Sequence, residues 1–326
     1  MIMQSKKPLK IAIVKLSALG DIVHAVIVLQ FIKKHAPDAH ITWIVDVRFA
    51  EILKDHPLID ELVVVPLKKS FKESFKILKH LDKFDVVIDL QGLLKSAIVT
   101  RLLGKNTYGF SKESAKEKIA SKFYKHKFSI DYNENIIVRN LGLAAFAMDF
   151  KFSKDEILNK EPCFEVHGKK PQNAGKKRIL IAPFASEESK CYDKFKAVIN
   201  LLKEYEIYVC HGNAAELEKA KILVQGTHAM LLEKMSIKQM IDFIASCDLT
   251  IGNDSGLTHI AWAINAPSLT LFGNRPSHRN AYETPINLLI DMGRQIDARS
   301  IDKNDFCIRE IFPETVANFA RKILNG

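Results

Sequence analysis

The chain has 326 residues, of which 47% are hydrophobic and 26% charged, and its formal net charge is +10. These values are those of a soluble globular protein with room for two domains; no apolar run approaches the ~20 residues of a membrane helix, and the first ten residues are too short and polar for a secretory signal. Five widely spaced cysteines without metal-site spacing favour free thiols in a reducing cytosol.

Strand-like and helix-like runs alternate along the first half of the chain. The expected elements are strands at 10–15, 40–46, 61–66 and 84–89 and helices at 22–34, 71–81 and 133–148. The strand-like runs are short, apolar and rich in β-branched residues. Their alternation with helical patterns favours an α/β fold with a mostly parallel sheet.

A polar, lysine-rich stretch at 151–177, with two prolines and two glycines, predicts a linker or irregular connection. The alternation then restarts, with strands expected at 178–183, 206–210, 249–251 and 268–272 and helices at 193–205 and 313–324. We therefore predict two α/β domains that face a cleft, at 1–165 and 166–312. The terminal helix at 313–326 is expected to pack back on the N-terminal domain.

Two strand-to-helix turns, one near each end of the chain, combine glycine with aspartate. The first is Lys15-Leu16-Ser17-Ala18-Leu19-Gly20-Asp21, and the second is Gly252-Asn253-Asp254-Ser255-Gly256-Leu257-Thr258-His259. N–H groups at the start of a helix are unpaired and carry the positive end of its dipole, so such a turn can bind an anion; the structural alternative is a well-capped helix. The Gly-x-Gly-x-x-Gly and Walker A patterns are absent, which argues against simple NAD-binding and P-loop sites.

Three blocks of the sequence resemble the bacterial lipopolysaccharide heptosyltransferases of glycosyltransferase family 9. They are VKLSALGDIVH at 14–24, DLQGLLKS at 89–96 and DSGLTH at 254–259. The resemblance runs from about residue 10 to the C-terminus and implies a GT-B fold, with two Rossmann-like domains facing a cleft. One site departs from the family pattern: a Thr-Thr pair ahead of a lysine is replaced by Ala185-Ser186 ahead of Lys190, so one hydroxyl is missing.

The resemblance implies an inverting transferase that moves L-glycero-D-manno-heptose from ADP-heptose to Kdo of Kdo-lipid A. The middle block is most like the family members with that acceptor; an acceptor that already carries heptose is one alternative. A non-catalytic nucleotide-binding module is another, and the presence of Asp21 argues against it. We expect no cofactor and no metal, a monomer, and a cytoplasmic enzyme that is peripheral to the inner membrane.

Two residues are expected to be catalytic by the resemblance. Asp21 would be the general base that deprotonates the Kdo hydroxyl; the alternative is a carboxylate that caps a helix N-terminus. Lys190 would stabilise the charge that builds on the leaving diphosphate, which would replace a metal ion. The alternative for Lys190 is a surface lysine that pairs weakly with Glu187 and Glu188.

The expected donor site lies in the second domain. Amides at Ser255 and Gly256 would meet the diphosphate, while Asp254 would cap the helix or accept a hydrogen bond from a sugar hydroxyl, because like charges exclude it from phosphate. The resemblance adds four residues: Ser186, Glu216 on the ribose, Met235 in the adenine pocket, and His259 facing the donor. For Met235 and His259 the alternative is ordinary core packing.

The expected acceptor site lies in the first domain, where glycines allow close approach and polar side chains offer donors. Its residues are Ser17, Gly20, Gln91, Gly92, Lys95, Lys68, Lys69, Lys72 and Lys116. The lysines would cradle an acceptor that carries carboxylates and phosphates, and the alternative is a solvated helix face. The net charge also suits an anionic membrane surface, whereas nucleic acid is disfavoured because no binding motif accompanies it.

Overall fold

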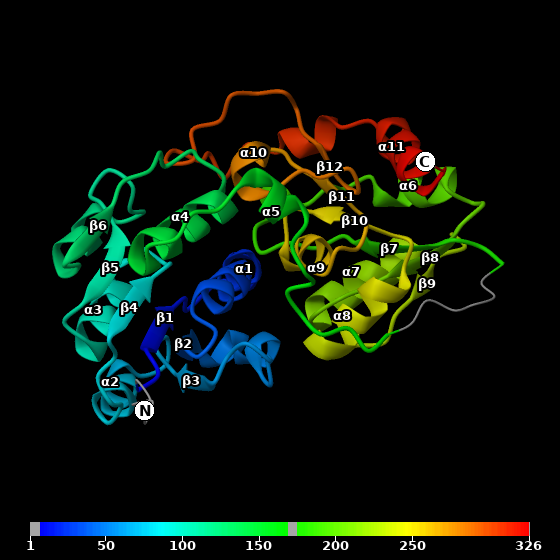
Figure 1. Ribbon diagram of the computed structural model, residues 1–326. Helices are drawn as coiled ribbons and strands as arrows, with labels where there is room; N and C mark the ends of the chain where they lie inside the picture. Colours follow the sequence, from blue (N-terminus) through cyan, green and yellow to red (C-terminus); the bar gives the residue numbers. More distant parts are fainter. Residues whose placement is uncertain (1–6, 169–174, 326) are drawn as a thin grey trace. The chain divides into compact units, whose positions relative to one another are not determined.

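The computed structural model describes residues 7–168 and 175–325 of the chain. The chain divides into two compact units, Met1–Lys160 and Glu161–Gly326, a boundary five residues earlier than expected. Both units alternate strands with helices (Figure 1), as the sequence pattern predicts. Residues 169–174, inside the predicted linker, lie outside the described residues.

A parallel six-stranded sheet forms the centre of the first unit. Its strands are β1 (Lys10–Val14), β2 (His40–Asp46), β3 (Glu61–Val65), β4 (Val86–Asp89), β5 (Thr107–Phe110) and β6 (His126–Phe128). They lie in the order β3-β2-β1-β4-β5-β6, and each neighbouring pair is parallel. The four predicted strands are present. The other two strands, β5 and β6, are not predicted from the sequence, because they span only four and three residues.

Two groups of helices flank this sheet (Figure 1). On one face α1 (Leu19–His35) packs against α4 (Ile136–Met148), and on the other α3 (Leu94–Leu103) packs against both α2 (Phe71–Lys79) and η2 (Lys118–Phe123). The remaining elements are η1 (Val47–Leu53) and α5 (Lys154–Leu158). α1 begins three residues before the predicted start, so Asp21 lies in its first turn rather than ahead of it.

The second unit repeats the design with its own parallel sheet. Its strands are β7 (Arg178–Ala182), β8 (Glu206–Val209), β9 (Met230–Leu231), β10 (Leu249–Asn253), β11 (Ser268–Leu271) and β12 (Asn287–Ile290). Its helices are α6 (Phe195–Leu201), α7 (Ala214–Val224), α8 (Ile237–Ser246), α9 (Gly256–Ala263), α10 (Ser277–Asn280), α11 (Pro313–Asn325), η3 (Glu188–Lys190) and η4 (Cys307–Glu310). The strand order is β9-β8-β7-β10-β11-β12, which matches the first sheet strand for strand.

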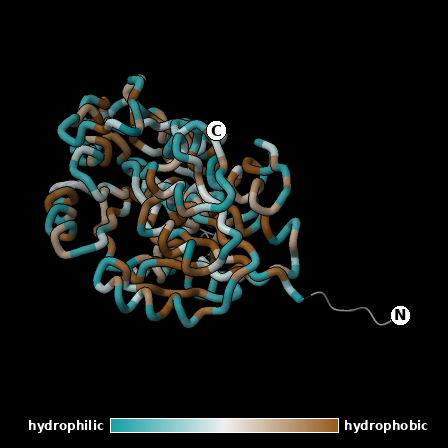
Figure 2. Tube along the Cα trace, turned by 90° about the vertical axis from the view of Figure 1, so that its left-hand side faces the viewer, coloured by the Kyte–Doolittle hydropathy of each residue, from teal (hydrophilic) through white to brown (hydrophobic). Residues whose placement is uncertain are grey.

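Buried aliphatic side chains of the strands form the core of each unit. Figure 2 shows hydrophobic segments running through the inside of the fold and hydrophilic segments along its outer turns. Trp43 of β2 and Phe195 of α6 are among the largest side chains that are fully buried. Burial of such apolar surface is the main force that holds α/β layers together.

The terminal helix α11 belongs to the second unit. Its apolar face, with Val316, Ala317, Ala320 and Leu324 buried, lies in the same core cluster as β7 and β10, and the helix packs against α6. These contacts do not test the expected packing of the helix on the N-terminal domain, which stays a prediction. The helix has one apolar stripe, and that stripe is used within its own unit.

The predicted linker at 151–177 is also only partly irregular. α5 forms inside it because Ser153 and Glu156 make a capping box, in which the side chain of each residue accepts a hydrogen bond from the backbone N–H of the other. Cys163 and Phe164 are buried, so the connection is packed rather than exposed at that point.

The strand order decides where ligands can bind. In both sheets the order reverses between the first and fourth strands, at β1/β4 and at β7/β10. Doubly wound Rossmann sheets bind ligands at the carboxyl ends of the strands beside this reversal. The segments that follow these strands carry Asp21, in the first turn of α1, and Gln91 in the first unit, and Lys190 and Asp254 in the second.

Candidate functional site

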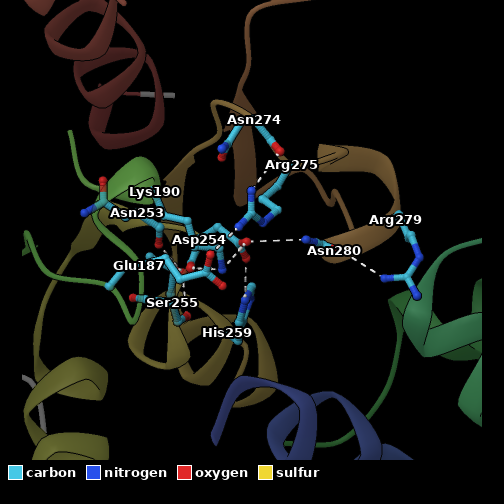
Figure 3. A network of polar contacts seen from close by, with 12 residues as sticks. Glu187, Lys190, Asn253, Asp254, Ser255, His259, Asn274, Arg275, Arg279 and Asn280 are labelled. Carbon is cyan, nitrogen blue, oxygen red and sulfur yellow. Dashed lines mark hydrogen bonds and ion pairs between the residues drawn. The ribbon is translucent and has the colours of Figure 1, made fainter. Parts of the chain in front are cut away.

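An ion pair joins the two central loops of the second unit (Figure 3). The Lys190 ammonium lies 2.7 Å from Asp254 Oδ2 and donates a second hydrogen bond, 3.0 Å long, to the Asp254 carbonyl. Lys190 is 17% exposed and Asp254 5%. The alternative of a surface lysine paired with Glu187 and Glu188 is therefore wrong, because the lysine is turned inward to the start of α9.

Asp254 is the charged centre of this site. Its other oxygen, Oδ1, lies 3.0 Å from Nε2 of His259, and the Asn280 amide approaches Oδ2 at 3.4 Å. Burial alone would raise the pKa of Asp254, but the Lys190 charge and the His259 hydrogen bond outweigh it and hold the pKa far below its usual range. Asp254 is thus a permanent anion that orients two cationic or polar groups.

The helix cap expected from Asp254 is not formed. Ser255 is the N-cap of α9, its backbone is extended, and no side-chain cap hydrogen bond is found for this helix among the described residues. The Ser255 hydroxyl is buried and has no partner in that part of the chain. The first N–H groups of α9 therefore stay available, as an anion site at a helix N-terminus requires.

Asn253 fixes the distance between the loops. Its side-chain oxygen accepts a hydrogen bond from the Tyr192 N–H at 3.0 Å, and its amide donates to the Pro183 carbonyl at 2.8 Å. Gly252 has no room for a side chain, because a Cβ there would lie 2.7 Å from the Ala182 carbonyl oxygen. The β7 and β10 loops are thus tied together on both sides of Lys190.

A second ion-pair group beside this site has no local sequence signal. Arg275, with a side chain 9% exposed in the loop after β11, lies 2.8 Å from the Glu187 carboxylate, and Lys303 lies 3.3 Å from the same oxygen. Burial alone would raise the pKa of Glu187, but the positive charges of Arg275 and Lys303 outweigh this effect and hold the pKa below its ordinary value. Figure 3 shows Arg275 and Glu187 beside Asp254.

Three other expected donor residues form no hydrogen bond with this cluster in the part of the chain that the structure describes. Glu216, in the first turn of α7, accepts a hydrogen bond from the Gly212 N–H at 2.7 Å. Met235 is half-buried just before Ser236, the N-cap of α8, and Ser186 is exposed in the Lys190 loop. The roles of these three residues towards a nucleotide stay predictions.

In the first unit, Gln91 holds the loop that precedes Asp21. Its side-chain oxygen accepts hydrogen bonds from the N–H groups of Leu16 and Ser17, at 3.1 and 3.2 Å. Asp21 is exposed, and its carboxylate accepts one hydrogen bond, 3.3 Å long, from the Ala18 N–H. Gln91 was expected to meet the acceptor, but its oxygen is used to fix this loop.

A buried carboxylate in turn orients Gln91. Asp89, at the end of β4, accepts hydrogen bonds from the N–H groups of Gln91 and Gly92 and from the Tyr124 hydroxyl, the last at 2.7 Å. Burial raises the pKa of Asp89 although these hydrogen bonds oppose the shift. Gly92 has φ +68°, a left-handed conformation that disfavours any side chain.

The start of α3 carries its own carboxylate. Glu117 accepts a hydrogen bond from the Leu94 N–H at 2.7 Å, and its own N–H donates to the Gly92 carbonyl. This pair closes the Gly92 turn onto the segment that follows β5. The acidic side chain also complements the positive end of the α3 dipole.

The remaining acceptor candidates lie on the surface or in the Asp21 turn. Gly20 is half-buried in the first turn of α1, as is Ser17 in the preceding loop. The lysine side chains expected to bind the acceptor are all exposed, at positions Lys68, Lys69, Lys72, Lys95 and Lys116. Among the described residues there is no group of three metal-ligating side chains, and no helix is long and apolar enough to cross a membrane.

Comparison with known proteins identifies the family. Residues 75–299 match the sequence profile of Glycosyltransferase family 9 (heptosyltransferase). The chain belongs to this family. It is 44% identical over 338 aligned positions to lipopolysaccharide heptosyltransferase 1 of Campylobacter coli, an alignment that covers 97% of this chain and 99% of that protein. The enzyme is thus a glycosyltransferase, as the three sequence blocks predict.

Solved structures show the same fold. E. coli heptosyltransferase WaaC with ADP superposes with a TM-score of 0.75 at 22% identity, covering 98% of this chain and all of that one. The family 9 glycosyltransferase of Veillonella parvula gives 0.81 at 18% identity, covering 98% of both chains. The predicted GT-B fold is confirmed.

We predict that Asp254→Asn destabilises the enzyme at neutral pH by about 3 kcal/mol, because two groups then lose a buried counter-charge. The folded-state pKa of Asp254 lies below its unfolded value, so ionised Asp254 stabilises the fold above about pH 4, and this contribution is lost as the pH falls further. Denaturant midpoints of the variant and wild type should therefore converge in acid.

Glu218→Gln is the matched control, since Glu218 forms an exposed ion pair with Lys221 in the same unit. It should change stability by less than about 0.5 kcal/mol. An Asp254→Asn midpoint equal to that of wild type at pH 7 would show that the ion pair does not stabilise the fold.

We predict that Gln91→Ala lowers turnover about 10-fold or more, with an unchanged KM for the nucleotide sugar, because a released loop misplaces Asp21. Gln91→Glu should restore turnover, since a carboxylate also accepts hydrogen bonds from the Leu16 and Ser17 N–H groups. If Glu is as damaging as Ala, the amide nitrogen rather than the oxygen carries the function. Steady-state kinetics with both variants decides between the two.

Proposed function

We propose that the enzyme transfers L-glycero-D-manno-heptose from ADP-heptose to Kdo of Kdo-lipid A, with inversion at the anomeric carbon. The observation that carries this proposal is the 44% identity, along nearly the whole chain, to a lipopolysaccharide heptosyltransferase 1. The superposable WaaC structures, one with ADP and one with ADP-2-deoxy-2-fluoro heptose, support the choice of donor.

The donor is assigned to the second unit. Lys190 and the open N–H groups at the start of α9 face one small region, where a diphosphate would meet a cation and a helix dipole together. Negative charge grows on the diphosphate as the sugar–oxygen bond breaks, so these groups stabilise the transition state more than the ground state. Asp254 would keep the lysine in place, and its like charge keeps phosphate off its own oxygens.

The acceptor and the base are assigned to the first unit. Asp21 would take the proton of the attacking Kdo hydroxyl as that oxygen bonds to the anomeric carbon. Asp21 is exposed and accepts a single hydrogen bond, so one of its carboxylate oxygens has no hydrogen-bond partner among the described residues. The exposed lysines 68, 69, 72, 95 and 116 would bind the carboxylates and phosphates of the acceptor.

The site of action in this proposal is the cytoplasmic face of the inner membrane, where the enzyme would be a peripheral monomer. The acceptor is itself a membrane lipid, and the net charge of +10 suits an anionic surface. No metal or other cofactor is assigned, since Lys190 and the α9 amides supply the positive charge that the leaving group needs.

The test is incubation with ADP-heptose and Kdo-lipid A, followed by mass spectrometry of the lipid. We expect addition of one heptose, at a rate that EDTA does not change. A parallel reaction with an acceptor that already carries heptose separates the main alternative. Product from that acceptor alone would overturn the acceptor assignment, and activity lost in EDTA but restored by magnesium would overturn the metal-free mechanism.

Asp21→Asn should lower kcat by about 10²–10⁴-fold while KM and thermal stability stay near wild type, because the amide keeps the Ala18 hydrogen bond but takes no proton. Asp38→Asn, an exposed aspartate of the same unit, is the control and should be fully active. If Asp21→Asn keeps more than about a tenth of the wild-type kcat, Asp21 is not the base.

A further inference from the structure

Helix α2 exposes two phenylalanines on one stripe. The exposed fractions of Phe71 and Phe75 are 45% and 38%, and the two residues are one turn apart, so their rings are neighbours on the helix surface. Leu78, next along the stripe, is buried in the core of the first unit. The apolar stripe of α2 is thus exposed in the first two turns of the helix and buried at Leu78.

The two rings are held out by a helix that is itself well fixed. The Ser70 hydroxyl accepts a hydrogen bond from the Glu73 N–H and caps α2, while the Ser74 hydroxyl donates to the Ser70 carbonyl. Ser74 and Leu78 are buried where α2 packs against α3 and β3. The exposure of the two phenylalanine rings therefore does not result from a frayed or loosely attached helix.

Lysines surround the exposed rings. Between positions 68 and 79 there are five lysines and a single acidic residue, Glu73. All five are exposed, at Lys68, Lys69, Lys72, Lys76 and Lys79. In the described part of the chain none of their ammonium groups forms an ion pair, in contrast to Lys10, Lys33 and Lys34 of the same unit.

The neighbouring element in the same layer repeats this composition. η2, which packs on the same helix α3 as α2 does, exposes 49% of Ile119. Four exposed lysines lie in and beside it, at Lys112, Lys116, Lys118 and Lys122. The layer of helices α2, α3 and η2 is therefore basic and carries apolar residues at its surface, on the face of the sheet opposite α1 and α4 (Figure 1).

Exposed phenyl rings among unpaired cations match one kind of surface. An anionic bilayer offers phosphates to the lysines and, immediately beneath them, a boundary between headgroups and acyl chains that accepts apolar rings. A convex helix flank is less suited to single-stranded nucleic acid, which binds in grooves that track its backbone. We propose that the face of α2 formed by Phe71, Phe75 and the flanking lysines binds an anionic lipid bilayer, with both rings inserted at the headgroup–acyl boundary.

This inference deepens the proposed function and rests on its membrane site of action. It adds an apolar anchor to what would otherwise be purely electrostatic attraction. Electrostatic attraction weakens as salt rises, because the Debye length falls from ~10 Å at 0.1 M to ~3 Å at 1 M, whereas ring insertion does not weaken with it. The two contributions can therefore be measured separately.

The experiment is sedimentation of the full chain with vesicles, without donor or acceptor. Vesicles of phosphatidylglycerol and phosphatidylcholine should bind wild-type protein, and vesicles of phosphatidylcholine alone should bind it at least about 10-fold more weakly. The double variant Phe71→Ser with Phe75→Ser should bind the anionic vesicles about 10-fold more weakly at moderate salt and not at all at high salt. Phe312→Ser is the matched control, since Phe312 is 69% exposed in the second unit.

The lysine contribution is tested by the double variant Lys76→Gln with Lys79→Gln, against Lys203→Gln with Lys234→Gln. Both pairs remove the same charge from exposed lysines, and the control pair lies in the second unit. Binding should weaken for the first pair alone. If both double variants lose vesicle binding equally, the binding depends only on net charge, and the assignment to α2 is overturned.

Insertion itself is read from Phe75→Trp, whose fluorescence should shift to shorter wavelength with anionic vesicles; the native Trp43 and Trp262 are buried and serve as a constant background. Unchanged emission, or full binding by the double serine variant, would overturn the proposal. Heptose transfer to a deacylated, water-soluble Kdo acceptor should be normal in that variant. Absence of such transfer in wild type would instead contradict the proposed function, whatever the vesicles show.

Discussion

The buried ion pair between Lys190 and Asp254 is the interaction on which the candidate site depends. It joins the loops after β7 and β10, the two strands between which the order of the second sheet reverses. A lysine placed there without Asp254 would be a costly buried charge, and an aspartate without the lysine would repel an anionic ligand. Together with His259 and Asn253 they form a fixed polar frame in front of α9.

The same topology is used twice, and this explains how the residues of each unit are brought together. In the first unit Gln91, from the β4 loop, holds the β1 loop, just as Lys190 and Asp254 link the corresponding loops of the second. One link is made of neutral hydrogen bonds and the other of charges. Gln91 fixes its loop without placing a cation beside Asp21. The Lys190–Asp254 pair, in contrast, places a cation where an anionic ligand is expected.

The sequence predicts the elements with strong local patterns and misses those decided by distant contacts. The turn at Asp254 to His259 and the strands beside it are predicted because glycine, caps and apolar runs are neighbours in the chain. Arg275 and Glu187 are 88 residues apart, so their pairing leaves no local pattern. β9 has two residues, too few to show a period, and the capping box at Ser153 and Glu156 is lost within a lysine-rich stretch.

The helices α1, α3 and α9, which follow the strands beside the two sheet reversals, differ in the charge at their N-termini. In the first unit the Asp21 carboxylate lies in the opening turn of α1, and Glu117 occupies the start of α3. In the second unit α9 starts at a serine that makes no side-chain cap among the described residues. A diphosphate would therefore be repelled from two helix starts and accepted at the third. The repeated topology is therefore used with different charge at its helix starts, which directs an anion to α9 and away from α1 and α3.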